Sequence, residues 1–183
     1  MIYHFTLQHV ALVVGIILVL IGVPGLFSPQ LTQGTARKLP RSFMAGVAVL
    51  AIDLAWSFWL LSTMEMGEFQ TFRRPLLILL PVGFFLVLRF VEEFLFVRAL
   101  GILCLLAAEP LLDAAFLRPE NARLAVTVFA YLLVVAGIMW VTMPYLLRDQ
   151  IKWAEGNPWR WRLLHGASVL YGAVVLLLAF TRY

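Results

Sequence analysis

The stretch from Arg98 to Arg118 reads RALGILCLLAAEPLLDAAFLR, in which two arginines enclose residues that are almost all apolar. A hydrocarbon core of about 30 Å is crossed by about 20 helical residues, so this stretch has the length of a transmembrane helix. It also holds Glu109 and Asp113, which are four residues apart and therefore share one helix face. Because a carboxylate in lipid is costly and usually faces protein or a wet cavity, this helix needs neighbours.

The composition of the whole chain supports the same conclusion. Of its 183 residues, 63% are hydrophobic and 13% are charged, and the mean hydropathy is +0.94. Soluble domains are about 45–50% apolar and about 25% charged, so a soluble fold of this length would leave apolar surface uncovered. The sequence therefore predicts an all-α, polytopic integral membrane bundle that forms a single transmembrane domain over residues 1–183.

The apolar runs predict six spans and, from their order, three helical hairpins. Consecutive spans are expected to pair, the first with the second, the third with the fourth and the fifth with the sixth. Segment 28–41 is expected to be a polar loop. Segment 148–162 is expected to be an amphipathic connection with Trp153, Trp159 and Trp161 as interfacial anchors. The expected spans are 7–27, 42–64, 75–88, 98–118, 124–147 and 163–180.

The distribution of basic residues predicts an orientation. Segments 28–41, 89–98 and 148–162 hold nine of the fourteen Lys and Arg residues. Basic loops are retained in the cytoplasm, so these three segments are expected there, with both chain termini outside. The net charge of +4 is explained by such loops, and we expect no nucleic-acid partner.

Small residues predict where helices approach each other closely. Gly101 and Gly166 each lie near the start of an expected span. Glycines in membrane helices allow backbones to come into contact, so both positions are expected at helix–helix crossings.

Three acids, Asp53, Glu109 and Asp113, form a candidate intramembrane polar or ion site. Asp53 follows Arg41 by twelve residues and Glu109 follows Arg98 by eleven, which places both about 16–18 Å deep, near the midplane. Three interpretations remain open: hydrogen bonding that holds helices together, a proton or cation site, or contact with a partner subunit. The second and fourth spans are therefore expected to be neighbours, or each acid is expected to meet a polar partner from another subunit.

Four charged residues, Arg89, Glu92, Glu93 and Arg98, form a candidate interfacial charge cluster. Solvated ion pairs explain this pattern most simply, and catalytic carboxylates are an alternative that has no companion motif. No Cys/His spacing, nucleophile motif or phosphate-binding loop is found. We therefore expect no cofactor, no metal and no enzymatic activity.

These features favour a non-catalytic accessory or scaffold subunit that packs in a larger membrane complex. Its expected partners are the lipid bilayer and other membrane-protein subunits or further copies of itself. The alternative is a small transporter or proton/cation conduit that uses the intramembrane carboxylates. The first is favoured because the sequence offers no substrate-sized set of polar residues and no loop large enough to gate a pathway.

Overall fold

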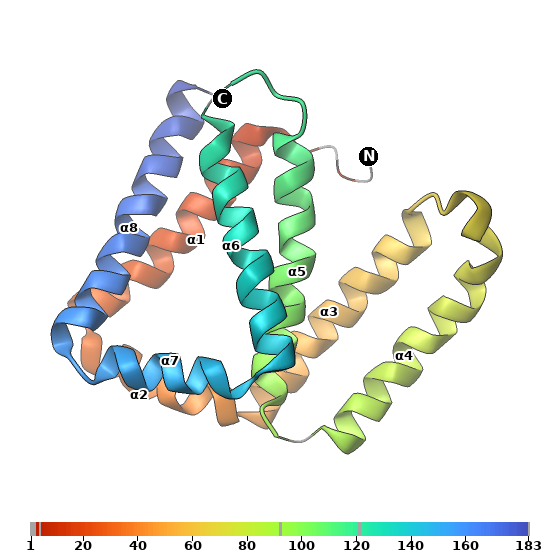
Figure 1. Ribbon diagram of the computed structural model, residues 1–183, viewed down its shortest axis with the longest axis horizontal. Coiled ribbons are helices and arrows are strands. Elements are labelled where there is room, and N and C mark those ends of the chain that lie inside the picture. The colour runs from red at the N-terminus through yellow and green to blue at the C-terminus, as the bar shows by residue number, and fades with distance from the viewer. Residues whose placement is uncertain (1–2, 4, 92, 121, 183) are drawn as a thin grey trace.

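The computed structural model describes residues 3, 5–91, 93–120 and 122–182, and within them it contains helices and turns but no strand. Six helices are long and apolar enough to cross a membrane. The fold is therefore the predicted all-α, multi-pass membrane bundle (Figure 1). These six are α1 (Leu7–Phe27), α3 (Phe43–Thr63), α4 (Arg73–Phe90), α5 (Leu95–Ala115), α6 (Arg123–Thr142) and α8 (Pro158–Thr181).

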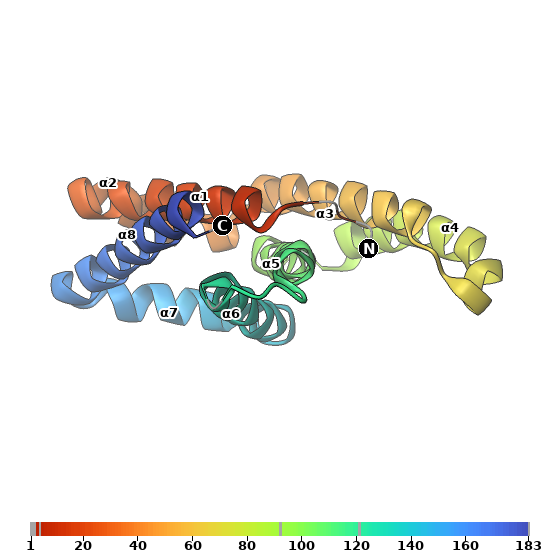
Figure 2. The same ribbon diagram turned by 90° about the horizontal axis from the view of Figure 1, so that it is seen from above.

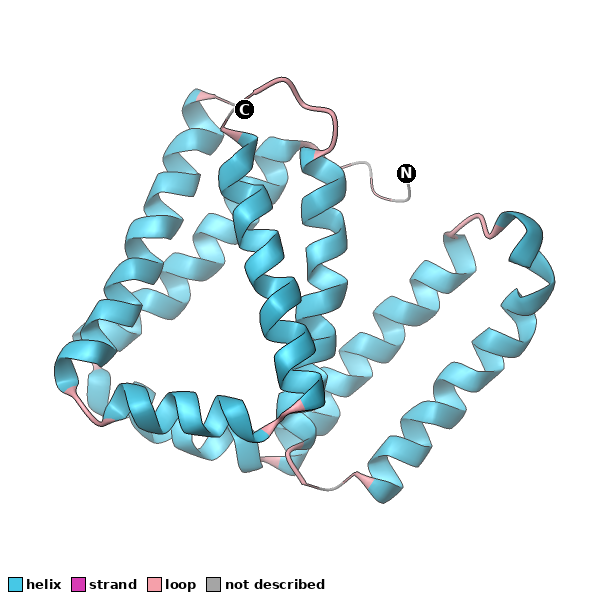
Figure 3. Cartoon of the chain, viewed as in Figure 1, coloured by secondary structure: helices cyan, strands magenta, loops and turns pink. Residues whose placement is uncertain are grey.

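Two shorter helices lie across one end of the long ones. They are α2 (Pro29–Lys38) and α7 (Tyr145–Glu155), and the connections between elements are short (Figures 1 and 3). Two 3₁₀ turns, η1 (Leu39–Arg41) and η2 (Gly67–Phe72), precede α3 and α4.

The prediction that 28–41 is a polar loop is wrong, because most of it is α2. Pro29 occupies the first turn, where its missing N–H would have had no intrahelical acceptor. Thr32 Oγ1 donates a hydrogen bond to the Ser28 carbonyl at 3.1 Å. Arg37 and Lys38 lie in the last turn, where cations interact favourably with the helix dipole.

The predicted pairing of the spans is also wrong. The packed pairs are α3 with α4, α5 with α6, and α8 with α1, which shifts every expected pair by one span. The reason lies in α2 and α7, each about 15 Å long at 1.5 Å per residue. Laid across the end of the bundle, they separate α1 from α3 and α6 from α8. The expected contact between the second and fourth spans is confirmed, because α3 packs against α5.

Two helix crossings bring glycine backbones together, and we call them the glycine seams. A Cβ added at Gly15 of α1 would lie 3.0 Å from the Gly172 carbonyl oxygen of α8, and the reverse distance is 2.9 Å. Gly101 of α5 and Gly137 of α6 meet in the same way, at 2.9 and 2.8 Å. The prediction for Gly101 is confirmed. The prediction for Gly166 is wrong, since nothing lies within 4 Å of an added Cβ there.

Polar contacts reinforce the seam between α1 and α8. Trp161 Nε1 donates a hydrogen bond to the Gly25 carbonyl at 3.2 Å. That carbonyl would normally accept from residue 29, which is a proline without an N–H. Trp161 is also buried, so its prediction as an interfacial anchor is wrong. Trp153 and Trp159 are exposed.

The α3–α4 hairpin extends away from this body. Figure 2 shows α3 and α4 continuing beyond α5 at one side of the molecule. None of the residues of α4 is buried, and α3 is the long helix against which it packs most. The molecule thus combines a closed body, made of α1, α5, α6 and α8, with one open hairpin.

Candidate functional site

A groove with a volume of about 360 Å³ runs between α3, α4 and α5, and we call it the Asp53 groove. Residues three and four apart on α3 and on α4 supply most of its walls, since such residues share one helix face. Apart from Asp53 and Ser57, which are one turn apart, every lining side chain is apolar or glycine. The lining residues are Leu50, Asp53, Leu54, Ser57, Leu61, Leu76, Leu79, Leu80, Gly83, Phe84, Val87 and Ile102.

The Asp53 carboxyl group is the exceptional feature of this groove. Asp53 is only 3% exposed, and neither carboxyl oxygen has a hydrogen-bond partner among the described residues. More than nine in ten buried polar groups in proteins have such a partner, and a missing one costs about 1–3 kcal/mol. Asp53 is therefore a buried acceptor that its own chain leaves unsatisfied.

The α4 wall of the groove is open. Leu79 is 60% exposed, and a Cβ added at Gly83 would meet nothing within 4 Å. In a helix that buries no residue, these positions leave room for further apolar atoms beside Asp53. The groove thus combines an accessible apolar wall with a concealed acceptor.

The other two predicted acids lie elsewhere on α5. Glu109 is exposed and Asp113 is half-buried. Both lie close enough to the Tyr3 hydroxyl to act on it: burial raises the pKa of Tyr3, the hydrogen bond from Trp56 opposes this, and the two carboxylates raise it further. Trp56 Nε1 donates that hydrogen bond at 2.6 Å. No hydrogen bond or ion pair among the described residues joins Asp53 to Glu109 or Asp113.

The predicted charge cluster at 89–98 is only partly described, because Glu92 lies outside the described residues. Arg89 and Glu93 are exposed and Arg98 is half-buried. None of these three takes part in the two ion pairs found in the described part of the chain.

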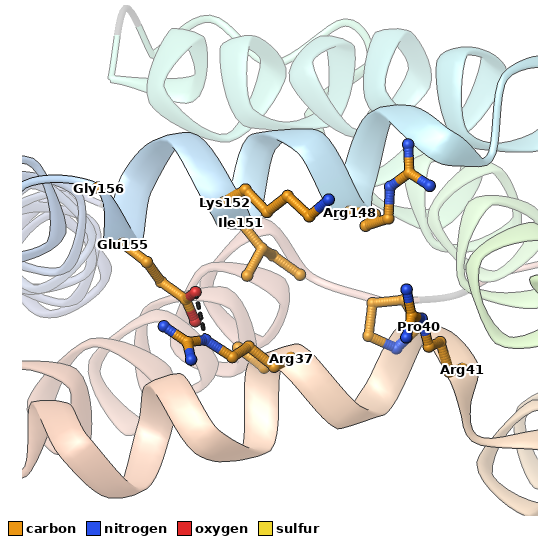
Figure 4. Close-up of a pocket in the computed structure, with 9 residues that line it drawn as sticks. Arg37, Pro40, Arg41, Arg148, Ile151, Lys152, Glu155 and Gly156 are labelled. Carbon is orange, nitrogen blue, oxygen red and sulfur yellow. Dashed lines mark hydrogen bonds and ion pairs between the residues drawn. The ribbon is translucent and has the colours of Figure 1, made fainter.

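A second cavity, which the sequence analysis missed, lies between α2 and α7, and we call it the basic pocket (Figure 4). Its volume is about 450 Å³. Arg37 Nε donates to Glu155 Oε2 at 2.6 Å across it. The signal was present in the sequence, because two basic segments were assigned to the same side of the membrane. The lining residues are Ala36, Arg37, Pro40, Arg41, Arg148, Ile151, Lys152, Glu155 and Gly156.

Metal and cofactor ligands are not assembled in the described residues. No group of three or more His, Cys, Asp or Glu residues there has the geometry to hold a metal ion. The His165 ring packs against the Trp161 ring in a tilted arrangement with 4.5 Å between centroids, and its Nδ1 lies 3.0 Å from the Trp161 carbonyl oxygen. His165 is thus a satisfied packing residue.

Comparison with known proteins gives no relative: no family model, no curated protein and no solved structure matches the chain. Function is therefore inferred from the Asp53 groove and the basic pocket.

Proposed function

We propose that the protein is a non-catalytic accessory subunit of a larger membrane complex and that its α3–α4 hairpin docks a transmembrane segment of another subunit. The observation that carries this proposal is the Asp53 carboxyl group, which is 3% exposed and has no hydrogen-bond partner among the described residues. A buried polar group in a bilayer needs a partner, and an adjoining groove is where a partner enters.

The chemistry of the groove defines the segment that it accepts. Its apolar walls fit an apolar helix, and Asp53 fits a Lys, Arg or His side chain, or another hydrogen-bond donor, near the bilayer midplane. A second copy of this chain offers no Lys or Arg at that depth, because every Lys and Arg of the six long helices lies close to a helix end, and its His165 is packed against Trp161. Charge complementarity therefore favours a different subunit.

The alternative function, a proton or cation conduit, has less support. A conduit requires a series of polar groups across the membrane. Asp53 makes no hydrogen bond to Glu109 or Asp113 in the described part of the chain, and Ser57 is the one other polar side chain that lines its groove. We therefore favour the accessory subunit.

We infer that the end of the molecule with α2 and α7 faces the cytoplasm. The described residues of segments 28–41, 89–98 and 148–162, which hold most of the basic residues, lie together at this end (Figure 1). Gly34→Cys and Gly156→Cys should be protected from an impermeant thiol reagent added outside, and Arg118→Cys at the other end should react. Labelling of the first two from outside would reverse the orientation.

Photocrosslinking in the native membrane tests the docking proposal. A photoreactive amino acid at Leu79, on the groove wall, should give one protein product, whereas the same residue at Leu170, equally exposed on α8, should label lipid. The product should disappear with Asp53→Leu. Its crosslinked peptide should be a transmembrane segment with a basic residue or another donor. Lipid labelling at both positions, a product between two copies of this chain, or a product unaffected by Asp53→Leu would contradict the proposal.

A further inference from the structure

The basic pocket is a second candidate binding surface. It lies near the N-terminal end of α3, whereas η2 follows the C-terminal end, and it shares no lining residue with the Asp53 groove. Four basic side chains and one carboxylate line it, namely Arg37, Arg41, Arg148, Lys152 and Glu155. Arg37 forms an ion pair with Glu155, and Arg148 forms one with its neighbour Asp149 at 2.9 Å. These are the two ion pairs found among the described residues, and Arg41 and Lys152 take part in neither of them. The pocket therefore keeps an excess of positive charge.

Both helices that form the pocket have the character of interfacial helices. They lie across the ends of the long helices rather than along them (Figure 1). Each also carries exposed apolar side chains, with Leu31 on α2 exposed by 75% and Trp153 on α7 by 56%. The Arg160 guanidinium lies 4.8 Å above the Trp153 ring, as expected of residues at the level of lipid headgroups. Amphipathic helices of this kind lie in the interface plane.

The position of the pocket determines which anion it meets. At headgroup level the abundant anions are the phosphodiesters of acidic phospholipids, and Arg and Lys side chains bind phosphate oxygens by charge-assisted hydrogen bonds. The Ala36, Pro40 and Ile151 side chains supply an apolar wall beside the charges, as a lipid glycerol and upper acyl chain require. A cavity of about 450 Å³ accommodates one such group.

We propose that the basic pocket between α2 and α7 binds the phosphate headgroup of an anionic phospholipid, with Arg41 and Lys152 as its main ligands. Glu155 holds Arg37 and thereby fastens α2 to α7, which fixes the width of the pocket. The lipid would add a second link between two helices that the Arg37–Glu155 ion pair already joins.

Lipid titration of the detergent-purified full chain, followed by native mass spectrometry, tests this proposal. Each basic residue beside an anionic headgroup contributes about a factor of five, so with Arg41 and Lys152 phosphatidylglycerol should bind about 25-fold tighter than phosphatidylcholine. Arg41→Gln with Lys152→Gln should remove this preference and leave phosphatidylcholine binding unchanged. Arg118→Gln with Arg182→Gln, which makes the same change of net charge at the opposite end, should retain it.

Two further measurements distinguish lipid binding from loss of folding and from binding of free phosphate. Arg41→Lys with Lys152→Arg preserves both charges and should keep the preference. A retained preference would show that substitution at these two positions does not by itself unfold the pocket, so the loss in the Gln double variant is due to the lost charges. Inorganic phosphate should displace phosphatidylglycerol only at concentrations far above that of the lipid, and displacement at equal concentration would assign the pocket to a free phosphate instead. Equal affinity of the unmodified chain for the two lipids, or equal losses in the two Gln double variants, would overturn the proposal.

Discussion

The glycine seams and the α3–α4 hairpin differ in how closely their helices approach each other. At Gly101 and Gly137 the backbones of α5 and α6 are so close that an added Cβ on either would lie within 3 Å of the other's carbonyl oxygen. At Gly83 of α4 an added Cβ would meet nothing within 4 Å. The hydrophobic effect does not drive helices together in lipid, so close packing and polar contacts are what hold a membrane bundle. The glycine seams have close packing and polar contacts, whereas the described residues on the open side of the α3–α4 hairpin have neither.

The difference indicates a division of roles. The seams bury the small residues and satisfy carbonyls, as Trp161 does by donating to the Gly25 oxygen at 3.2 Å. The hairpin leaves Asp53 buried without a hydrogen bond among the described residues. A region that stabilised only this chain would not retain such a carboxyl group, because a leucine would fill its place at lower cost. We therefore assign stability to the seams, and the hairpin is the region for which we propose a docking role.

Gly101→Leu should have the largest effect on stability. The Val141 side chain and the Gly137 carbonyl oxygen lie 2.8 and 2.9 Å from the position of a Cβ, so α5 and α6 must separate. We expect the free energy of unfolding in detergent to fall by about 3 kcal/mol. Gly166→Leu, at a glycine with open space, is the matched control and should lower it far less. Equal losses in the two variants would mean that the seam does not hold the body together.

Asp53→Leu should separate stability from binding. In the isolated chain the substitution removes two unsatisfied acceptors, and the free energy of unfolding should rise by about 2 kcal/mol. Asp53→Asn keeps an unsatisfied amide of similar size and should leave stability nearly unchanged. Thermal unfolding of the purified variants measures both. A marked loss of stability in Asp53→Leu would show that the carboxyl group already has a partner within the chain.

Gly83→Ala should have the smallest effect, and its sign sharpens the contrast. Alanine favours a helix over glycine by about 0.5–1 kcal/mol, and the open space at Gly83 adds no clash, so the variant should be slightly stabilised. Gly101→Ala, the same substitution at a seam, should be destabilised. The two shifts in melting temperature should therefore have opposite signs, and two shifts of the same sign would remove the distinction between seam and hairpin.

The sequence predicted the six spans because continuous apolar runs are a local property, and Leu7–Phe27 is found with the expected bounds. It did not predict which spans pair, because hydropathy carries no information about which helix faces are complementary. The helix α2 was missed for a different reason. Its polar composition is typical of a loop, and the local helix signals, Pro29 in the first turn and Arg37 and Lys38 in the last, were not used.

The candidate site was predictable in part. The cost of a charge in lipid led to the expectation that Asp53 faces protein, and Asp53 is buried. That Asp53 would lack a hydrogen-bond partner among the described residues, while Glu109 would be exposed on α5, depends on helix tilts that no local pattern encodes. Likewise, Arg41 and Lys152 are more than a hundred residues apart, and they line one pocket because α2 and the η1 turn that follows it lie beside α7.

The most direct test of the docking role of Asp53 is the mass of the particle that carries this chain after mild detergent extraction from its native membrane. Light scattering, corrected for bound detergent, should give a protein mass well above the 20.7 kDa of one chain. Asp53→Leu should reduce it to that of the chain alone, and Glu109→Leu, the same change at an exposed carboxylate on α5, should leave it unchanged. A single-chain mass for the unmodified protein, or an undiminished mass for Asp53→Leu, would contradict the account.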